Sequence, residues 1–226
     1  NMPFDNILQT NGATVATMLA LYALVEPEDH VISMYPTYQQ LYDIPKSLGA
    51  EVDLWEVEED KGWLPDLDQL RRLIRPNTKM ICINNANNPT GALMDAAYLG
   101  DLVAIAKEVD AYIFSDEVYR SFDQPAPSIV DLFVNGIAVN SLSKTYSIPG
   151  IRVGWVASNT KVANILRDYR DYTMICAGVF DDMVATLVLE NKEAILERNR
   201  QIVEVNLAIM DAWIVKEPNA SWIRPA

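Results

Sequence analysis

The chain has 226 residues, of which 50% are hydrophobic and 22% are charged. This length and apolar fraction are enough for one large domain with a sizeable core, and they exclude disorder along the whole chain. The 31 acidic and 18 basic residues give a formal net charge of −13. Because an acidic surface repels phosphate backbones and anionic lipids, we expect no nucleic acid and no membrane among its partners.

The amino-terminal residues, Asn1-Met2-Pro3-Phe4-Asp5, lack the basic and apolar regions of a signal peptide. Since Asn1 is not an initiator methionine, we expect the chain to be trimmed at this end. Cys82 and Cys176 lie far apart in apolar stretches, which indicates buried, reduced thiols in a cytoplasmic protein.

His30, the only histidine, directly precedes a predicted strand and is interpreted as a loop residue. With one histidine and no cluster of metal-ligand residues in the sequence, we expect neither a metal site nor histidine-dependent nucleophilic catalysis.

Short apolar runs rich in β-branched residues alternate with longer amphipathic stretches up to Trp155. Strands are predicted at 31–34, 51–54, 80–83, 112–114, 137–139 and 153–156. Helices are predicted at 13–25, 67–74 and 96–109, and Asp66 is the expected N-cap of the second. This alternation predicts an α/β fold with a mainly parallel central sheet and helices on both faces.

Beyond these strands the alternation ends. Helices are predicted at 160–172 and 181–189, followed by a long amphipathic helix at 192–216 that Pro218 terminates. The apolar residues that share one face of this helix are Ile195, Ile202, Val205 and Ile209. Residues 221–224 are predicted to open a new strand with nothing after it, so we expect the carboxyl terminus to be cut as well.

Two strings at element boundaries suit an anion and a polar ligand. Thr10-Asn11-Gly12-Ala13-Thr14 precedes a predicted helix, whose unpaired N–H groups and positive dipole end suit a phosphate, and Thr14 adds a hydroxyl donor. Asn84-Asn85-Ala86-Asn87-Asn88-Pro89-Thr90-Gly91 places amides on a stiff turn after a strand, at the sheet edge where ligands bind. An ordinary helix start and a polar loop remain the alternatives for either string alone.

Two further strings supply an acid and a lysine. Ser115-Asp116-Glu117-Val118-Tyr119 ends an apolar strand, and its acidic pair is either solvated or holds a cation. Ser141-Leu142-Ser143-Lys144 places a lysine at a strand end, which suits imine chemistry, although a surface lysine is the alternative. Together the four strings offer a phosphate cradle, a polar turn, an acid and a lysine, which are the groups that pyridoxal phosphate requires.

The strings Asn88-Pro89-Thr90-Gly91, Ser115-Asp116-Glu117-Val118-Tyr119, Ser141-x-Ser143-Lys144 and Gly150-x-Arg152-x-Gly154 resemble, in order and spacing, those of class I/II aminotransferases of fold type I. The resemblance covers essentially the whole chain, and the chain is also similar to the branch that holds capreomycidine synthase-like enzymes. It implies the large domain of that fold, pyridoxal 5′-phosphate as cofactor, and a homodimer when full-length.

The resemblance also implies a role for each matching residue. Lys144 would form the Schiff base with the cofactor, Asp116 would pair with its ring nitrogen, and these two together with Tyr119 are the predicted catalytic residues. Tyr119 and Asn88 would hydrogen-bond the 3′-oxygen, and Tyr38 would stack on the ring. The predicted phosphate ligands are Gly12, Ala13, Thr14, Ser141 and Arg152, and Ser143 is a further predicted cofactor contact.

The resemblance further implies the domain organisation. Residues 1–190 would form the cofactor-binding large domain, 191–216 the long helix leading to the small domain, and 217–226 the start of a truncated carboxyl-terminal small domain. The arginine that grips the substrate carboxylate and a tyrosine from the neighbouring subunit would then be missing, so we expect the chain alone to be inactive. Ala86 stands where the family frequently has a proline.

These inferences predict an aminotransferase that moves an amino group from an amino acid to a 2-oxo acid through Lys144. A lyase or cyclase could use the same lysine, because one fold supports several reactions. A non-catalytic, aminotransferase-like binding domain is the third hypothesis, although the presence of Lys144, Asp116 and Tyr119 favours catalysis. The sequence does not specify which amino acid or 2-oxo acid is the small-molecule partner.

Overall fold

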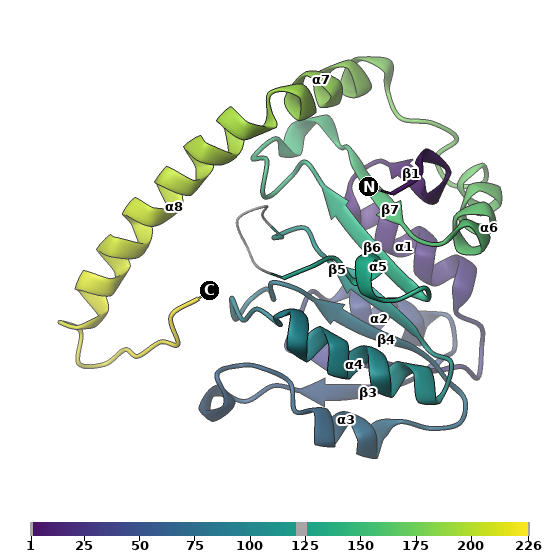
Figure 1. Ribbon diagram of the computed structural model, residues 1–226, viewed down its shortest axis with the longest axis horizontal. Coiled ribbons are helices and arrows are strands. Elements are labelled where there is room, and N and C mark those ends of the chain that lie inside the picture. Colours follow the sequence, from purple (N-terminus) through teal and green to yellow (C-terminus); the bar gives the residue numbers. More distant parts are fainter. Residues whose placement is uncertain (1, 121–125, 226) are drawn as a thin grey trace.

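The computed structural model describes residues 2–120 and 126–225, and all structural statements below concern these residues. Their strands form one sheet in the order β1-β7-β6-β5-β4-β2-β3, which crosses the centre of Figure 1. Pairing is parallel from β3 through to β6, whereas β7 pairs antiparallel with both β6 and β1. The predicted, mainly parallel sheet is therefore confirmed. The strands are β1 (Ile7–Thr10), β2 (His30–Tyr35), β3 (Glu51–Glu56), β4 (Thr78–Asn84), β5 (Tyr112–Asp116), β6 (Gly136–Ser141) and β7 (Gly154–Ala157).

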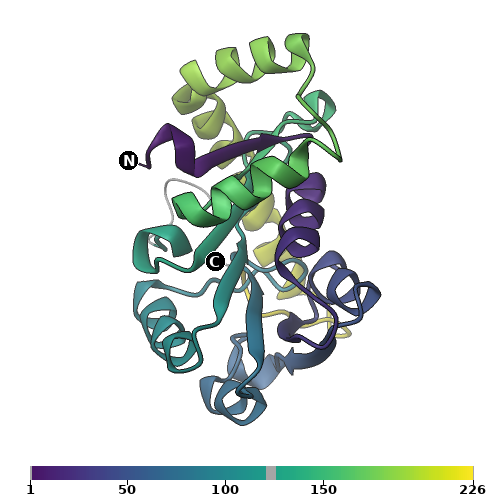
Figure 2. The same ribbon diagram turned by 90° about the vertical axis from the view of Figure 1, so that its right-hand side faces the viewer.

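Helices cover both faces of the sheet, as Figure 2 shows from the side. Buried residues of α1, α2 and α6 pack on one face, and those of α3, α4 and α5 pack on the other. The α-helices in the described residues are α1 (Ala13–Leu24), α2 (Gln40–Ser47), α3 (Leu67–Leu73), α4 (Ala96–Glu108), α5 (Ile129–Leu132), α6 (Thr160–Arg170), α7 (Val179–Glu190) and α8 (Lys192–Ile214). Short 3-10 turns lie at Phe4–Asn6, Glu59–Lys61 and Pro149–Ile151.

Strand β4 shows why the central strands are apolar throughout. Its side chains alternate between the two layers: Met80 and Cys82 join the core under α1, whereas Ile81 and Ile83 join the core under α4. A strand that is covered on both faces buries every side chain, and each such aliphatic side chain contributes about 1.5–3 kcal/mol. The predicted N-cap of α3 is also confirmed, because the Asp66 carboxylate accepts from the N–H groups of Asp68 and Gln69.

The sequence predicts neither β1 nor α2. Strand β1 has only four residues and exists because it pairs antiparallel with β7, a contact distant in sequence. Helix α2 contains Pro45, which lacks the N–H of a regular helical turn and obscures the helical pattern. Burial of Leu41 against α1 stabilises this helix in spite of the proline.

Three expectations are wrong. His30 is not a loop residue: it lies fully buried in β2, where its ring nitrogens pair with Thr78 and Asp53. Cys82 is buried as predicted, but Cys176 is exposed in the segment between α6 and α7. Residues 221–225 form no strand, since no partner strand lies beside them in the described part of the chain.

The predicted long helix is confirmed as α8, which extends away from the sheet in Figure 1. Ile195 packs against a small core that includes Leu142 and Tyr146, whereas Ile202 and Ile209 of the same stripe are exposed. No helix in the described residues is both long and apolar enough to cross a membrane.

Candidate active site

All predicted site residues except Gly12 line one cavity of about 230 Å³. It lies at the edge of the sheet where β4, β5 and β6 end, with Asn84, Asp116 and Ser141 as the last residues of those strands. The predicted residues that the structure brings together there are Ala13, Thr14, Tyr38, Asn88, Asp116, Tyr119, Ser141, Ser143, Lys144 and Arg152. Strings far apart in the sequence therefore meet in one place.

The start of α1 forms an anion cradle. Gly12 precedes the helix with φ +86°, and a Cβ there would overlap the guanidinium of Arg152. A Cβ on Gly154 would lie 2.7 Å from the backbone N of Ala13, so both glycines permit a close approach of chain segments. The free N–H groups and dipole of the first turn, together with Arg152, attract a dianion such as a phosphate.

Arg152 is held in place beside this turn. Its Nη1 donates to the Pro149 carbonyl at 2.7 Å and to Ser143 Oγ at 3.3 Å. Ser141 Oγ in turn accepts from the N–H of Ser143 at 3.3 Å. The guanidinium and these hydroxyls therefore line the cavity beside the start of α1.

The carboxyl group of Asp116 is almost completely shielded from solvent. Its side chain is buried, and this desolvation raises the pKa of Asp116 to about 6, against the opposing effects of the Val118 N–H and the charge of Lys144. The Val118 N–H donates to Oδ1 at 3.1 Å. A cationic N–H entering the cavity would favour the carboxylate and lower this pKa, so the position suits a protonated ring nitrogen.

Lys144 is an exposed residue at the turn after β6. Its Nζ lies 5.6 Å from the centre of the Tyr119 ring, so the predicted amine and the predicted phenol face each other. Primary amines and aldehydes condense to imines, and this amine lies in the same cavity as the anion cradle and Asp116.

The four asparagines of residues 84–88 fall into two groups: two line the cavity, and two bond within the loop or to its neighbours. Asn84 donates to the Asp116 carbonyl at 2.9 Å and accepts from the N–H of Asn88 at 2.7 Å, which fixes Asn88 at the cavity wall. Asn85 instead bonds to the backbone of Met94, and Asn87 to Pro36 and Thr90. Half of the string therefore stiffens the loop rather than facing a ligand.

The two adjacent acidic residues, Asp116 and Glu117, also lie in different surroundings. Glu117 does not line the cavity; it accepts from Ser128 Oγ at 3.0 Å and from the Ile129 N–H at 2.9 Å, at the start of α5. Burial raises the pKa of Glu117 to about 7, while these hydrogen bonds oppose the rise. Successive strand residues point to opposite faces, which is why only Asp116 reaches the cavity.

Sequence reasoning assigned no role to several residues that complete the wall. Thr17 lies one helical turn beyond Thr14 on α1, so helical spacing could have identified it. Gln40 donates to the Thr14 carbonyl at 3.4 Å from α2, a helix that the sequence does not predict. The unassigned wall residues are Thr17, Gln40, Asn84, Val118 and Pro149.

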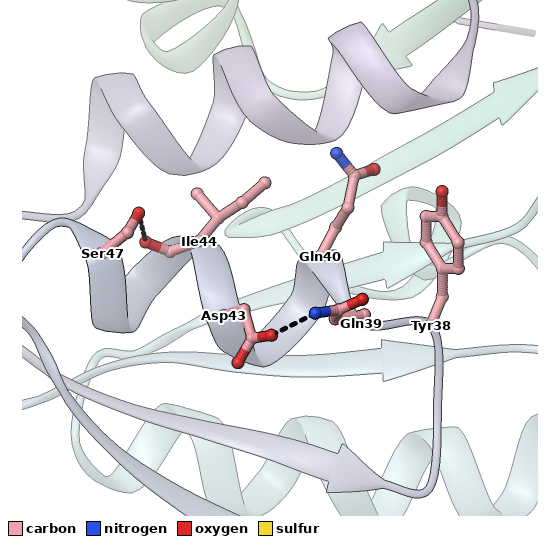
Figure 3. A pocket seen from close by; sticks show the side chains of 6 residues that line it. All are labelled: Tyr38, Gln39, Gln40, Asp43, Ile44 and Ser47. Carbon is pink, nitrogen blue, oxygen red and sulfur yellow. Dashed lines mark hydrogen bonds between the residues drawn. The ribbon is translucent and has the colours of Figure 1, made fainter.

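A second hollow of about 280 Å³ runs along α2 and shares Tyr38 and Gln40 with the cavity (Figure 3). Its polar side chains bond locally: Gln39 donates to Asp43 at 2.6 Å, and Ser47 to the Ile44 carbonyl at 2.7 Å. It therefore brings no additional reactive group to the cavity. Among the described residues, no group of three or more His, Cys, Asp or Glu side chains could hold a metal ion.

Comparison with known proteins gives a consistent result. The model of the family "Aminotransferase class I and II" matches residues 3–213. The aspartate aminotransferase of Thermotoga maritima is 34% identical over 193 residues, which are 82% of this chain and 51% of that protein. The capreomycidine synthase of Streptomyces vinaceus is 28% identical over 197 residues, which are 86% of this chain and 51% of that protein. The chain thus spans about half the length of these curated relatives.

A solved structure of a PLP-dependent aminotransferase from Streptococcus suis 89-1591 superimposes with a TM-score of 0.96. It is 72% identical to this chain, and the match covers 98% of this chain and 59% of that one. The family match over nearly the whole chain and this likeness agree with the cavity built from Lys144, Asp116 and the cradle at α1. The chain belongs to the class I and II aminotransferase family, whose members depend on pyridoxal 5′-phosphate.

Proposed function

We propose that this chain binds pyridoxal 5′-phosphate and contributes to transfer of an amino group from an amino acid to a 2-oxo acid. The observation that carries the proposal is the meeting of an amine, a buried carboxyl group and an anion cradle in one cavity. When bound, the cofactor supplies an aldehyde for the amine and a ring that accepts electrons.

The described residues fit the phosphate end of this group. A Cβ at position 12 would overlap the Arg152 guanidinium, so Gly12 leaves the space in which that guanidinium lies beside α1. We assign phosphate binding to the backbone of Ala13 and Thr14, to Ser141 and to Arg152, with Ser143 as a further contact. The helix dipole and the guanidinium stabilise the negative charge.

The ring and the amine find their partners at the other side of the cavity. Asp116 would keep the ring nitrogen protonated, Tyr119 and Asn88 would bind the 3′-oxygen, and Tyr38 would cover the ring. We assign the removal of the proton from the substrate Cα to Nζ of Lys144, because Lys144 is the only lysine among the described residues that line the cavity.

We also propose the domain limits 1–190, 191–216 and 217–226 for the large domain, the long helix and the start of a small domain. A cytoplasmic homodimer is proposed for the whole protein. Support for a partner surface comes from α7, where Val179, Phe180 and Met183 are 60–84% exposed although they are apolar.

The amino-group donor is tested with the purified protein and added cofactor. The relatives named aspartate aminotransferase make aspartate the first candidate donor. We expect an amino acid from an L-amino-acid panel to change the cofactor absorbance, and a 2-oxo acid to reverse the change. Reversal without a 2-oxo acid, with release of an altered product, would instead support a lyase or cyclase, the second candidate because of the capreomycidine synthase relative. Cofactor binding with no absorbance change for any donor would contradict both reactions.

A further inference from the structure

The turn that carries Lys144 is tied to two other parts of the molecule through the next residue, Thr145. Thr145 Oγ1 lies 3.0 Å from the Val118 carbonyl and 3.3 Å from the Arg120 carbonyl. A hydroxyl has one proton, so it donates to these two acceptors in a shared or alternating way. The two carbonyls stand on either side of Tyr119, whose ring faces Lys144.

The backbone of Thr145 makes the second connection. Asn199 on α8 donates from Nδ2 to the Thr145 carbonyl at 2.9 Å, across 54 residues of sequence. This bond is partly buried and lies beside the small core in which Ile195 and Leu196 of α8 pack against Leu142 and Tyr146. Helix α8 therefore contacts the lysine turn through the Asn199 hydrogen bond and through apolar side chains.

Two backbone hydrogen bonds within the turn are short-range. The Ser147 N–H donates to the Lys144 carbonyl at 2.8 Å, and the Ile148 N–H donates to the Leu142 carbonyl at 2.9 Å. These bonds fix the shape of the turn but not its place relative to Tyr119. Thr145 Oγ1 supplies that placement, because it joins the turn directly to the segment that carries Tyr119.

We propose that Thr145 and Asn199 are positioning residues for Lys144: Thr145 sets the lysine turn against the Tyr119 segment, and Asn199 couples that turn to α8. The inference rests on the proposed function, since Lys144 and Tyr119 are assigned there. Neither side chain lines the cavity, so both act through the residues they hold. A displacement of α8 is transmitted to the lysine through the Asn199 bond.

The test uses Thr145→Val, which keeps the shape and removes the hydroxyl, Thr145→Ser, which restores it, and Asn199→Leu. Thr173→Val is the matched control, because its hydroxyl donates to the Arg170 carbonyl at 3.0 Å in the exposed turn after α6. For each protein we measure the rate at which added pyridoxal phosphate attaches to Lys144, the pH midpoint of the bound absorbance, and the affinity for inorganic phosphate.

We expect Thr145→Val to slow attachment about three- to tenfold, the range supplied by one hydrogen bond, and to move the pH midpoint by about half a unit. Asn199→Leu should act in the same direction, Thr145→Ser should restore the wild-type values, and Thr173→Val should change nothing. Phosphate affinity should stay unchanged, because the cradle at α1 is separate.

An unchanged rate and midpoint in folded Thr145→Val and Asn199→Leu would overturn the inference. An equal loss of phosphate affinity would also overturn it, by showing a general disturbance of the cavity. If the wild-type protein does not attach the cofactor at Lys144, the proposed function fails instead, and that result is distinct from either outcome.

Discussion

Asp116 shows how a binding site can oppose the stability of its own fold. Since burial raises its pKa from 3.8 to about 6, the folded protein binds this proton more tightly than the unfolded chain does. The protonated Asp116 side chain stabilises the folded state below pH 4, and this stabilisation is lost as the pH rises through about 6. At pH 8 the buried carboxylate therefore lowers the free energy of unfolding.

Asp116→Asn removes that charge and should raise the free energy of unfolding at pH 8, without cofactor, by about 1–3 kcal/mol. The same variant should bind pyridoxal phosphate at least about tenfold more weakly, because it loses a charge-assisted contact. Urea denaturation and cofactor titration measure the two effects. Glu117→Gln is the control: it also removes a buried carboxyl group but should leave cofactor affinity intact. Wild-type affinity in Asp116→Asn would place the ring nitrogen elsewhere.

Gly12 permits a second test at single-residue resolution. Gly12→Ala adds a Cβ that overlaps the Arg152 guanidinium at a residue with φ +86°. We expect affinity for inorganic phosphate, measured by calorimetry, to fall about tenfold or more, because the displaced guanidinium no longer completes the cradle.

The control for this change is Gly62→Ala, which also adds a Cβ at a positive φ, +67°, but meets no atom within 4 Å. Gly62→Ala should lose about 1–2 kcal/mol of stability from its left-handed conformation, and Gly12→Ala should lose more, because φ +86° with ψ 169° is a conformation that essentially only glycine adopts. Equal phosphate affinities in the two variants would show that the gap beside Arg152 is not part of an anion site.

At the β3 edge of the sheet, a partly buried polar cluster joins several elements. His30 at the start of β2 contacts Thr78 of β4 at 2.8 Å and Asp53 of β3 at 3.2 Å. Arg75 donates to Asp53 at 2.7 Å and pairs with Glu51, so the cluster clamps the edge strand β3 to its neighbours. Burial, with help from Arg75, lowers the pKa of His30, whereas Asp53 and Glu51 oppose this effect.

This clamp predicts an acid-sensitive edge. Because the folded-state pKa of His30 lies below 6.5, the unfolded chain binds the proton first as the pH falls, and stability declines through the window below 6.5. His30→Gln should reduce the dependence of the unfolding free energy on pH between pH 5 and 7. His30 is the only histidine, so its imidazole signals in a proton NMR titration give the pKa directly. A folded-state pKa above 6.5 would contradict this account.

At the scale of elements, the sequence predicts what local patterning controls. Apolar runs locate β2 to β7, and amphipathic spacing locates α1, α4 and α8 to within a few residues. It does not reveal β1, whose pairing with β7 is a tertiary contact, or α2, whose Pro45 contradicts helical propensity. The sequence does not predict the burial of His30 for the same reason: its hydrogen-bond partners come from β3 and β4.

Across the whole molecule, the sequence predicts which residues meet in the cavity better than it predicts which surfaces are exposed. Motif order and the parallel-sheet topology together bring Lys144, Asp116 and the start of α1 to one cavity. The sequence does not predict the orientation of each polar side chain, because Asp116 at the end of β5 and Glu117 directly after it differ only in the face to which they point. The sequence of α8 likewise predicts an apolar stripe but not which part of that stripe is covered by other elements.

Covalent trapping of the cofactor tests the central claim most directly. The purified protein is incubated with pyridoxal phosphate, reduced with borohydride, digested and mapped by mass spectrometry. The account predicts a pyridoxyl adduct on Lys144, abolished in Lys144→Ala and weakened in Gly12→Ala. An adduct on another lysine, with Lys144 unmodified, would contradict it.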